Sequence, residues 1–395
     1  MKKLSIYLHI PFCIKKCAYC DFLSAPADDV TQRVYIAALE REITAWHDKA
    51  EEYVVDTVFF GGGTPSCLER GLLERILCKL KEVFHFSDKP EITVEVNPGT
   101  VDITKLQSYR NAGINRLSIG LQSPFEEDLK ALGRIHDYSE FMSTYSGARQ
   151  VGFDNINIDL MAALPGQTVE RYKEGLHKVL ALKPEHISAY SLIIEENTPF
   201  YNRYVNRKEL LPDEDAEREM YDATEQILSE YGYHRYEISN YAREGFACRH
   251  NLVYWQGGDY LGLGLGASSM MNHTRFKGTD ILSDYLEKWS KVSGIFQASA
   301  EDYEQVQILS IKEQMEEFMF LGLRCMAGVS EADFFSRFGV TMESVYEKQL
   351  EKLVGYGLME CKVDNNPELC KQDKRWRLTK RGIDVSNAVF VEFLL

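Results

Sequence analysis

The sequence predicts an α/β protein, a partial (β/α)6 barrel of the TIM type with a smaller, winged-helix-like α+β domain at its C-terminal end. Two observations indicate this fold class. Apolar, strand-like stretches alternate with helical patterns through the first half of the chain. These strands are rich in β-branched residues, as expected for parallel strands whose two faces are both covered. The 395 residues suffice for two or three domains of roughly 150 residues each.

Strands and helices are expected in a regular order from residue 4 to residue 194. The strands are expected at residues 4–10, 55–63, 91–98, 116–123, 155–165 and 186–194. The helical patterns between them lie at residues 28–50, 69–84, 104–112, 126–152 and 169–182. Such repetition predicts a parallel sheet, either barrel-like or doubly wound, and both types bind their ligands at the carboxyl ends of the strands.

The regular alternation ends near residue 195, and the pattern changes again near residue 301. We therefore expect a barrel core at 1–195, an extension that caps the barrel at 196–300, and a C-terminal domain at 301–395. The last domain is predicted to have helices at 308–325, 331–338 and 345–355, followed by strands near 358–363 and 375–382. Three helices followed by a two-stranded ribbon are the layout of a winged helix.

Charge and cysteine content limit the class of protein. A formal charge of −15 argues against a non-specific nucleic-acid binder, because such proteins need a basic surface. Nine cysteines, three of them clustered, are typical of a reducing compartment with one metal or redox site. The first residues, "MKKLSIYLHIPFC", are interrupted by His9 and Pro11 and lack a cleavage site, so they do not fit a signal peptide. No run approaches the roughly 18 apolar residues of a membrane span. We expect a cytoplasmic protein.

The most specific motif is a group of three cysteines in the loop after the first expected strand. Cys13, Cys17 and Cys20 have the spacing C-x3-C-x2-C. Thiolates hold iron–sulfur clusters, and three of them would leave one iron of a [4Fe-4S] cluster open to another chelator. This interpretation is favoured over two others, which are a zinc site and three ordinary free cysteines. A structural zinc site needs four ligands, so it would have to recruit Cys67, Cys78 or His9.

Polar residues and glycines gather at the expected carboxyl ends of the strands. The glycines of "GGGTP" at residues 61–65 would let the backbone approach a ligand closely, although a tight strand-to-helix turn would also use them. Glu95, Gln122 and Asp159 stand at the ends of later strands. Because these ends meet at one edge of a parallel sheet, the residues are expected to share a site with the cysteines.

The cysteine motif, its position and "GGGTP" are together similar to the radical S-adenosylmethionine superfamily. The resemblance implies that the amino and carboxylate groups of S-adenosylmethionine chelate the open iron, and that an electron from the cluster cleaves the sulfonium to a 5′-deoxyadenosyl radical. The segments "YLHIPFC", "EVNP", "LSIGLQS", "LGRIHD" and "DLMAALPGQT" resemble, in order, the oxygen-independent coproporphyrinogen oxidase branch over residues 4–194. By the same resemblance, the S-adenosylmethionine pocket would be lined by Tyr7, Tyr19, Gly62, Gly63, Thr64, Glu95, Gln122, Arg134 and Asp159.

Two features separate the chain from those oxidases. Phe22 stands where their motif, C-x3-C-x2-C-x-C, has its last cysteine. The segment "HNLVYW" at residues 250–255 resembles the H-N-x-x-Y-W signature of the HemW family of heme chaperones. This resemblance implies that His250, expected on an irregular loop, binds heme iron through its imidazole, with Tyr254 and Trp255 packed on the macrocycle. The alternative is a histidine that is hydrogen-bonded within its own loop.

The leading hypothesis is a heme chaperone that carries a [4Fe-4S] cluster with S-adenosylmethionine. Its implied partners are heme and a heme-acceptor protein, with peripheral association with membrane proteins as a further prospect and no nucleic acid. The second hypothesis is a radical enzyme that oxidatively decarboxylates coproporphyrinogen III. Radical modification of RNA is a third, which the charge of −15 disfavours. The segment "GLGLGA" at residues 262–267 matches the dinucleotide fingerprint in form but lies outside a regular βαβ unit, so a glycine-rich turn is expected there.

Overall fold

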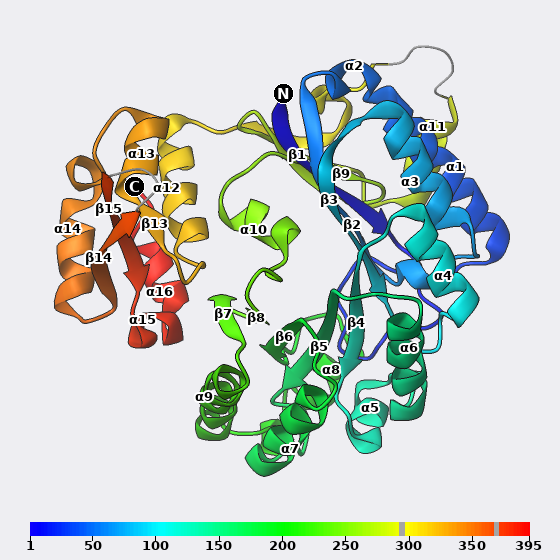
Figure 1. Ribbon diagram of the computed structural model, residues 1–395, viewed down its shortest axis with the longest axis horizontal. Helices are drawn as coiled ribbons and strands as arrows, with labels where there is room; N and C mark the ends of the chain where they lie inside the picture. Colours follow the sequence, from blue (N-terminus) through cyan, green and yellow to red (C-terminus); the bar gives the residue numbers. More distant parts are fainter. Residues whose placement is uncertain (292–296, 367–370) are drawn as a thin grey trace.

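One large sheet organises the molecule (Figure 1). The structure is a computed structural model that describes residues 1–291, 297–366 and 371–395. Within these residues the sheet has the strand order β12-β11-β10-β9-β1-β2-β3-β4-β5-β6-β8-β7. The six expected strands are confirmed as β1 (Lys2–Ile10), β2 (Tyr53–Gly62), β3 (His85–Val96), β4 (Arg116–Gln122), β5 (Ile156–Ala162) and β6 (His186–Ser191). They run parallel in sequential order, as in a partial barrel, whereas the strand order of a doubly wound sheet reverses.

Helices between these strands form a continuous layer over the outer face of the sheet. They are α1 (Asp29–Ala45), α2 (His47–Ala50), the short η1 (Pro65–Cys67), α3 (Leu72–Val83), α4 (Ile103–Ala112), α5 (Glu126–Leu132), α6 (Tyr138–Gln150) and α7 (Val169–Leu180). Helix α1 contacts α3, α3 contacts α4, and α4 contacts α6. Helix α1 begins at Asp28, whose carboxylate accepts a hydrogen bond from the Thr31 amide, and it turns Tyr35 and Leu39 into the core.

Two of the expected helices are divided, so those predictions are wrong in extent. The helix expected at 28–50 breaks at Trp46. The helix expected at 126–152 breaks into α5 and α6 because Gly133 ends α5 in a left-handed conformation, with φ of 74°. Asp137 then starts α6 with a reciprocal cap that includes Glu140. The interruption holds Arg134 outside both helices, next to the ends of the parallel strands.

The residues after β6, from 196 to 308, lengthen the sheet at both edges. On the β1 side, β9 (Tyr260–Leu263) is parallel to β1 and leads to the antiparallel strands β10 (Ser268–Met271), β11 (Thr274–Lys277) and β12 (Glu304–Ile308). On the β6 side lie β8 (Asn240–Ala242) and β7 (His234–Glu237). The helical elements here are α8 (Pro199–Tyr204), η2 (Lys208–Leu210), α9 (Glu214–Glu230), α10 (Arg249–Trp255), α11 (Leu282–Lys291) and η3 (Ala300–Asp302). Residues 262–267 join β9 to β10 with no helix after them, so they lack the strand–turn–helix setting of a dinucleotide site.

The C-terminal residues form a separate α+β unit with its own core, drawn in golden yellow to red in Figure 1. Its elements are α12 (Ile311–Gly322), β13 (Val329–Ser330), α13 (Glu331–Phe338), α14 (Met342–Gly355), β14 (Met359–Asn366), β15 (Lys371–Leu378), α15 (Lys380–Asp384) and α16 (Ser386–Val391). Met319, Phe334, Tyr346 and Phe393 are fully buried in this second core. The three helices and the ribbon are confirmed, but the first helix begins at Ile311 rather than at 308, because residue 308 ends strand β12 and Ser310 caps the helix. Cys370 lies outside the described residues.

The inner face of the parallel strands carries a layer of buried polar side chains. Each of the six strands contributes at least one, and the following six are at most 7% exposed: Ser5, Thr57, Glu91, Arg116, Asn157 and His186. Helix α10 lies against this layer, between the sheet and the C-terminal domain (Figure 1). The carboxylate of Glu91 accepts hydrogen bonds from the amides of Arg249 and His250, at 3.1 and 3.0 Å. A polar residue of β3 therefore fixes the first turn of α10.

A buried carboxylate at the β9 edge gives the first testable prediction. Glu42 of α1 is 0% exposed and accepts hydrogen bonds from the hydroxyls of Tyr285 and Tyr303 and from the amide of Gly264, at 2.7, 2.8 and 2.8 Å. Glu42→Ala leaves these three donors buried without a partner, so we expect the free energy of unfolding to fall by about 3 kcal/mol in urea titrations. Glu51→Ala, at an exposed position, is the control and should change it by less than about 0.5 kcal/mol. Equal losses in the two variants would contradict this role for Glu42.

Candidate functional site

A cavity of about 630 Å³ lies at the carboxyl ends of the parallel strands. It is enclosed by the loop after β1, by the ends of β2 to β6 and by Asn251 of α10. Most of the residues expected in one site line it together: Cys13, Cys17, Tyr19, Cys20, Gly62, Gly63, Thr64, Glu95, Gln122, Arg134 and Asp159. Tyr7 and His250 are not among its lining residues. The cavity therefore brings together residues from six different segments of the chain, among them three cysteines, two carboxylates and the Arg134 guanidinium.

The cysteine loop is fixed by backbone hydrogen bonds to neighbouring elements. The Cys13 amide donates to the carbonyl of Ala25, and the Ala18 amide donates to that of Leu132, at 3.2 and 3.1 Å. The Cys13 sulfur lies 3.4 Å from the Thr64 hydroxyl, and Arg134 Nη1 lies 3.5 Å from the Cys17 sulfur. The described residues contain no group of three or more Cys, His, Asp or Glu side chains already gathered about one point. The loop thus presents three partly exposed thiols to one cavity, with the Arg134 guanidinium beside one of them.

The donor set fits an iron–sulfur cluster better than zinc, because none of the three candidate fourth ligands faces the cavity. Both ring nitrogens of His9 are occupied, Nδ1 by the Tyr7 hydroxyl at 3.0 Å and Nε2 by the Leu23 carbonyl at 2.8 Å. Cys67 donates its thiol to the backbone of Phe12, and Cys78 is exposed on α3. A set of three thiols is short of the four ligands that a structural zinc ion requires.

Two carboxylates line the cavity. Glu95 at the end of β3 accepts a hydrogen bond from the Gly62 amide at 3.2 Å. Asp159 of β5 accepts one from the Asn157 amide group at 2.7 Å. Burial, together with the nearby charge of Asp159, raises the pKa of Glu95 to about 8, and burial also raises the pKa of Asp159. A ligand that donates hydroxyl or amino hydrogens would relieve this pair.

Arg134 offers unused hydrogen-bonding capacity in the cavity. Its Nη2 donates to Asn97 Oδ1 and to the Gly120 carbonyl, at 2.7 and 2.8 Å. Its buried Nε has no hydrogen-bond partner among the described residues. A guanidinium with a free donor beside a thiol is suited to a ligand that carries a carboxylate.

The glycines of "GGGTP" have a structural role in addition to the expected approach to a ligand, which stays a prediction. A Cβ atom on Gly62, which has φ of 110°, would lie 2.6 Å from the His9 ring, and one on Gly63 would lie 2.6 Å from the Phe12 carbonyl oxygen. The Gly63 amide donates to Ile10 at 2.9 Å. These glycines are therefore required by the chain that leaves β1, which passes directly over them and places the cysteine loop.

His250 lies on helix α10, so the expectation of an irregular loop is wrong; the short helix forms because Glu91 accepts from the first amides of the segment. Its ring is 1% exposed, and its nitrogens contact the Thr57 hydroxyl at 2.7 Å and the Tyr254 hydroxyl at 2.8 Å. Thr57 donates its own proton to Ser5, so it accepts from Nδ1–H of His250, and Nε2 accepts from Tyr254. Burial lowers the pKa of His250 to about 3 and keeps the ring neutral.

Phe22 and Phe59 form two boundaries of the cavity, Phe22 towards solvent and Phe59 towards His250. Phe22, at the position of the absent fourth cysteine, is 70% exposed and lines the mouth of the cavity. Phe59 lines the wall and stacks on the ring of His250, with the ring centres 5.2 Å apart. His250 is thus next to the cavity but behind its aromatic wall.

Sequence reasoning did not single out several lining residues. Asn97, Arg116 and Tyr190 all face the cavity. Asn97 lies within the recognised segment "EVNP" and could have been found there, since its amide group also donates to the Thr64 hydroxyl at 2.7 Å. Arg116 and Tyr190 stand inside strands with no local signal. Only the sheet register shows that they point to the same space.

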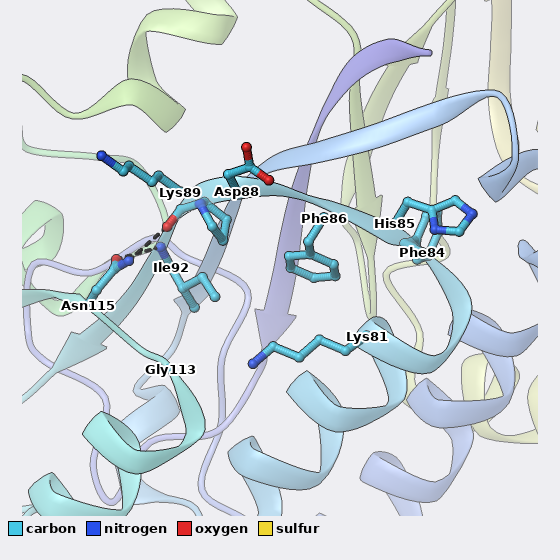
Figure 2. Close-up of a pocket in the computed structure, with 10 residues that line it drawn as sticks. Lys81, Phe84, His85, Phe86, Asp88, Lys89, Ile92, Gly113 and Asn115 are labelled. Carbon is cyan, nitrogen blue, oxygen red and sulfur yellow. Dashed lines mark hydrogen bonds between the residues drawn. The ribbon is translucent and has the colours of Figure 1, made fainter.

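A second cavity, of about 730 Å³, lies at the opposite end of β3. Figure 2 shows His85 and Lys89 directed away from each other, with the ring of Phe86 between them and Lys81. The Lys81 ammonium donates to the Ala112 carbonyl at 2.8 Å. Because its ionisable groups do not converge, this cavity does not have the arrangement of a catalytic or metal site.

Comparison with known proteins agrees with the geometry of the first cavity. Residues 7–179 match the radical SAM superfamily, and residues 309–385 match the HemN C-terminal domain. The chain is 35% identical to the heme chaperone HemW of Bacillus subtilis (strain 168), over 99% of this chain and 99% of that protein. It is 34% identical to the heme chaperone HemW of Escherichia coli (strain K12), over 99% and 98% of the two chains. The fold is similar to that of coproporphyrinogen III oxidase (HemN) from Escherichia coli, with a TM-score of 0.81, 24% identity and coverage of 100% and 90%.

The carboxylate pair gives a prediction for the ligand-free protein. Because the pKa of Glu95 is raised in the folded state to about 8, the folded protein binds more protons than the unfolded chain above the normal pKa of about 4.3. The contribution of Glu95 to stability is therefore complete below about pH 4.3 and is lost as pH rises towards 8. In urea titrations at pH 5, 6.5 and 8, Glu95→Gln should reduce the fall in unfolding free energy over this range. Glu196→Gln, at an exposed site, is the control. An unchanged pH dependence in Glu95→Gln would contradict the burial argument.

Proposed function

The chain belongs to the HemW family of radical S-adenosylmethionine proteins, and from this membership we propose that it is a heme chaperone, which binds heme and passes it to an acceptor apoprotein. The observation that carries the proposal is similarity over the whole chain to proteins named as heme chaperones. The three-cysteine loop with Phe22 and the segment "HNLVYW" support it from the sequence.

We further propose that the cavity holds two cofactors. Cys13, Cys17 and Cys20 would bind a [4Fe-4S] cluster, and the surrounding residues would bind S-adenosylmethionine against its open iron. When bound, these groups supply one-electron reductive chemistry at the sulfonium. The free Nε donor of Arg134 would orient the ligand carboxylate, while Glu95 and Asp159 would accept from its amino or hydroxyl groups. The remaining proposed contacts are Tyr7, Tyr19, Gly62, Gly63, Thr64 and Gln122.

His250 is the proposed iron ligand for heme, and its surroundings set a condition on that role. The Nε2 lone pair, through which the imidazole would bind iron, accepts the Tyr254 hydroxyl, and the ring is buried. Heme can reach it only after Tyr254 has moved and α10 has separated from the sheet. Binding at His250 is therefore expected to be slow compared with diffusion.

The oxidase is the principal competing function, because the fold is shared with HemN. The two are separated by assaying the protein, reconstituted anaerobically with its cluster, against coproporphyrinogen III. A heme chaperone is expected to release no carbon dioxide above the level of a cluster-free sample. Turnover to protoporphyrinogen would overturn the chaperone proposal and identify the protein as the oxidase.

The proposed function also includes a cellular compartment for the protein and a way to reach its heme acceptor. No helix in the described residues is long and apolar enough to cross a membrane. The eight cysteines that the structure describes are free thiols, as a reducing cytoplasm would keep them. We propose a cytoplasmic chaperone that reaches its acceptor by direct contact, including acceptors held at the membrane.

A pair of substitutions tests the ligand role of His250. In Soret titrations of the anaerobically reconstituted protein with heme, we expect His250→Ala to weaken saturable binding at least about tenfold, because an axial ligand is lost. Tyr254→Phe should strengthen binding, because it removes the hydroxyl that occupies Nε2. Tyr231→Phe, at a 51% exposed tyrosine, is the matched control. Binding that is equal in wild type, His250→Ala and Tyr254→Phe would exclude His250 as the ligand.

A further inference from the structure

A third cavity, of about 250 Å³, lies where the β10–β11 edge of the sheet meets the C-terminal domain. Its lining comes from three parts of the chain: Gly257 shortly after α10, the β10–β11 hairpin with the residue after β12, and helices α12 and α13. The lining residues are Gly257, Met270, His273, Leu309, Gln314, Glu317, Phe318, Arg337 and Phe338. None of these residues takes part in the cysteine cavity.

His273 is presented to this cavity by a tight turn. Asn272 and His273 form the two-residue turn between β10 and β11, with φ of 47° and 59°. Asn272 anchors the turn, since its amide group donates to the Tyr53 hydroxyl at 2.8 Å and its backbone amide donates to Asp259 at 3.0 Å. The backbone carbonyl of His273 accepts from the Leu309 amide at 2.9 Å. The imidazole itself is exposed, with no hydrogen-bond partner among the described residues. The turn is therefore rigid while the imidazole is available.

The walls of the cavity are apolar, and one cation stands at its edge. Met270 and Leu309 are 8% and 5% exposed, and Phe318 and Phe338 pack edge to face with ring centres 5.9 Å apart. The Arg337 guanidinium lies 5.3 Å from the centre of the Phe318 ring and pairs with no carboxylate in the described parts of the chain.

Glu317 is the acidic residue of the lining, and its charge is already compensated. Its Oε1 accepts from Arg275 Nη2 at 2.7 Å in an ion pair. An anion that enters the cavity would therefore meet the unpaired cation of Arg337 rather than an unpaired carboxylate. Apolar walls, an available imidazole and an unpaired guanidinium are the complementary groups for a flat apolar molecule that carries a metal and carboxylates.

We propose that this cavity is a second heme site, at which His273 binds the iron and Arg337 pairs with a propionate. The inference rests on the proposed heme-chaperone function and adds to it a place where heme is first received. Met270 and the two phenylalanines would pack on the edge of the macrocycle. Pockets that enclose small molecules measure roughly 300–1,000 Å³. The cavity, at about 250 Å³, is smaller, so heme stays partly exposed, as suits a ligand that is to be passed on.

The position of the site connects it to His250. Gly257, in the cavity lining, lies two residues after the end of α10, and the carbonyl of the intervening Gln256 accepts from Arg337 Nη2 at 3.2 Å. His250 lies seven residues earlier, which is about 10 Å along a helix. A second contact holds the same end of α10: the ring of Trp255 lies 4.3 Å from the Arg324 guanidinium of the C-terminal domain. When Arg337 pairs with a heme propionate, it gives up its hydrogen bond to the Gln256 carbonyl, so the end of α10 is held less firmly. Loosening of α10 then uncovers His250.

Stopped-flow mixing of heme with the full-length, reconstituted protein tests the proposal through the initial rate of the Soret change. We expect His273→Ala to lower the association rate constant at least tenfold, because the accessible ligand is lost. His234→Ala is the matched control, since His234 is likewise an exposed histidine, on β7 at the other edge of the sheet. It should leave the rate within twofold of wild type. Met270→Leu, which keeps the volume, should lower the rate less than His273→Ala does.

The outcomes separate this inference from the proposed function. A slower association in His273→Ala but not in His234→Ala supports the receiving site. An unchanged rate in His273→Ala, or equal losses in both histidine variants, overturns it while wild-type binding still supports a heme chaperone. Absence of saturable heme binding by the wild type overturns the chaperone function and the second site together. Circular dichroism spectra and melting temperatures that match those of wild type confirm that each variant is folded.

Discussion

The constraint on which the rest of the structure depends is a layer of polar side chains buried inside the parallel sheet. Thr57, Glu91, Asn157 and His186 belong to it, and each must find a partner because an unpaired polar group in the interior costs about 1–3 kcal/mol. Asn157 and His186 contact each other at 2.6 Å, and the hydroxyl of Tyr236 of β7 contacts the other ring nitrogen of His186 at 2.8 Å. Thr57 and Glu91 are completed by α10. The helix with the sequence "RHNLVYW" is therefore part of the fold's interior.

Helix α10 is held at its two ends by different parts of the molecule. The sheet holds its first turn through Glu91, whereas the C-terminal domain holds its last residues through Arg324 on Trp255 and Arg337 on Gln256. A chaperone must hold its cargo and then release it, and a short helix between two domains can provide both states. Asn251 of α10 also lines the cysteine cavity, so a ligand in that cavity and a movement of α10 both affect Asn251.

The fold class and much of the site followed from the sequence because they depend on local patterns. Buried parallel strands read as β-branched runs, and residues such as Glu95 and Asp159 lie at their ends, so the topology alone brings them together. Features set by distant partners were not predictable. Helix α10 is too short to form by propensity, and it exists because Glu91, far away in the chain, accepts from its first amides. The residues around Arg116 do not mark it as part of a site. The helical pattern of residues 126–152 predicts one helix, whereas Gly133, in a left-handed conformation, divides it into two.

Amide hydrogen exchange of α10, residues 249–255, with and without saturating heme, tests the central claim most directly. Without heme, the amides of Arg249 and His250 donate to a buried carboxylate and should exchange slowly, at a rate near that of the strand cores. The account predicts that heme makes these amides exchange faster, while strands β1 to β6 keep their protection. Slow exchange in α10 that heme at saturation leaves unchanged would contradict the account, because His250 would then have stayed closed while heme was bound.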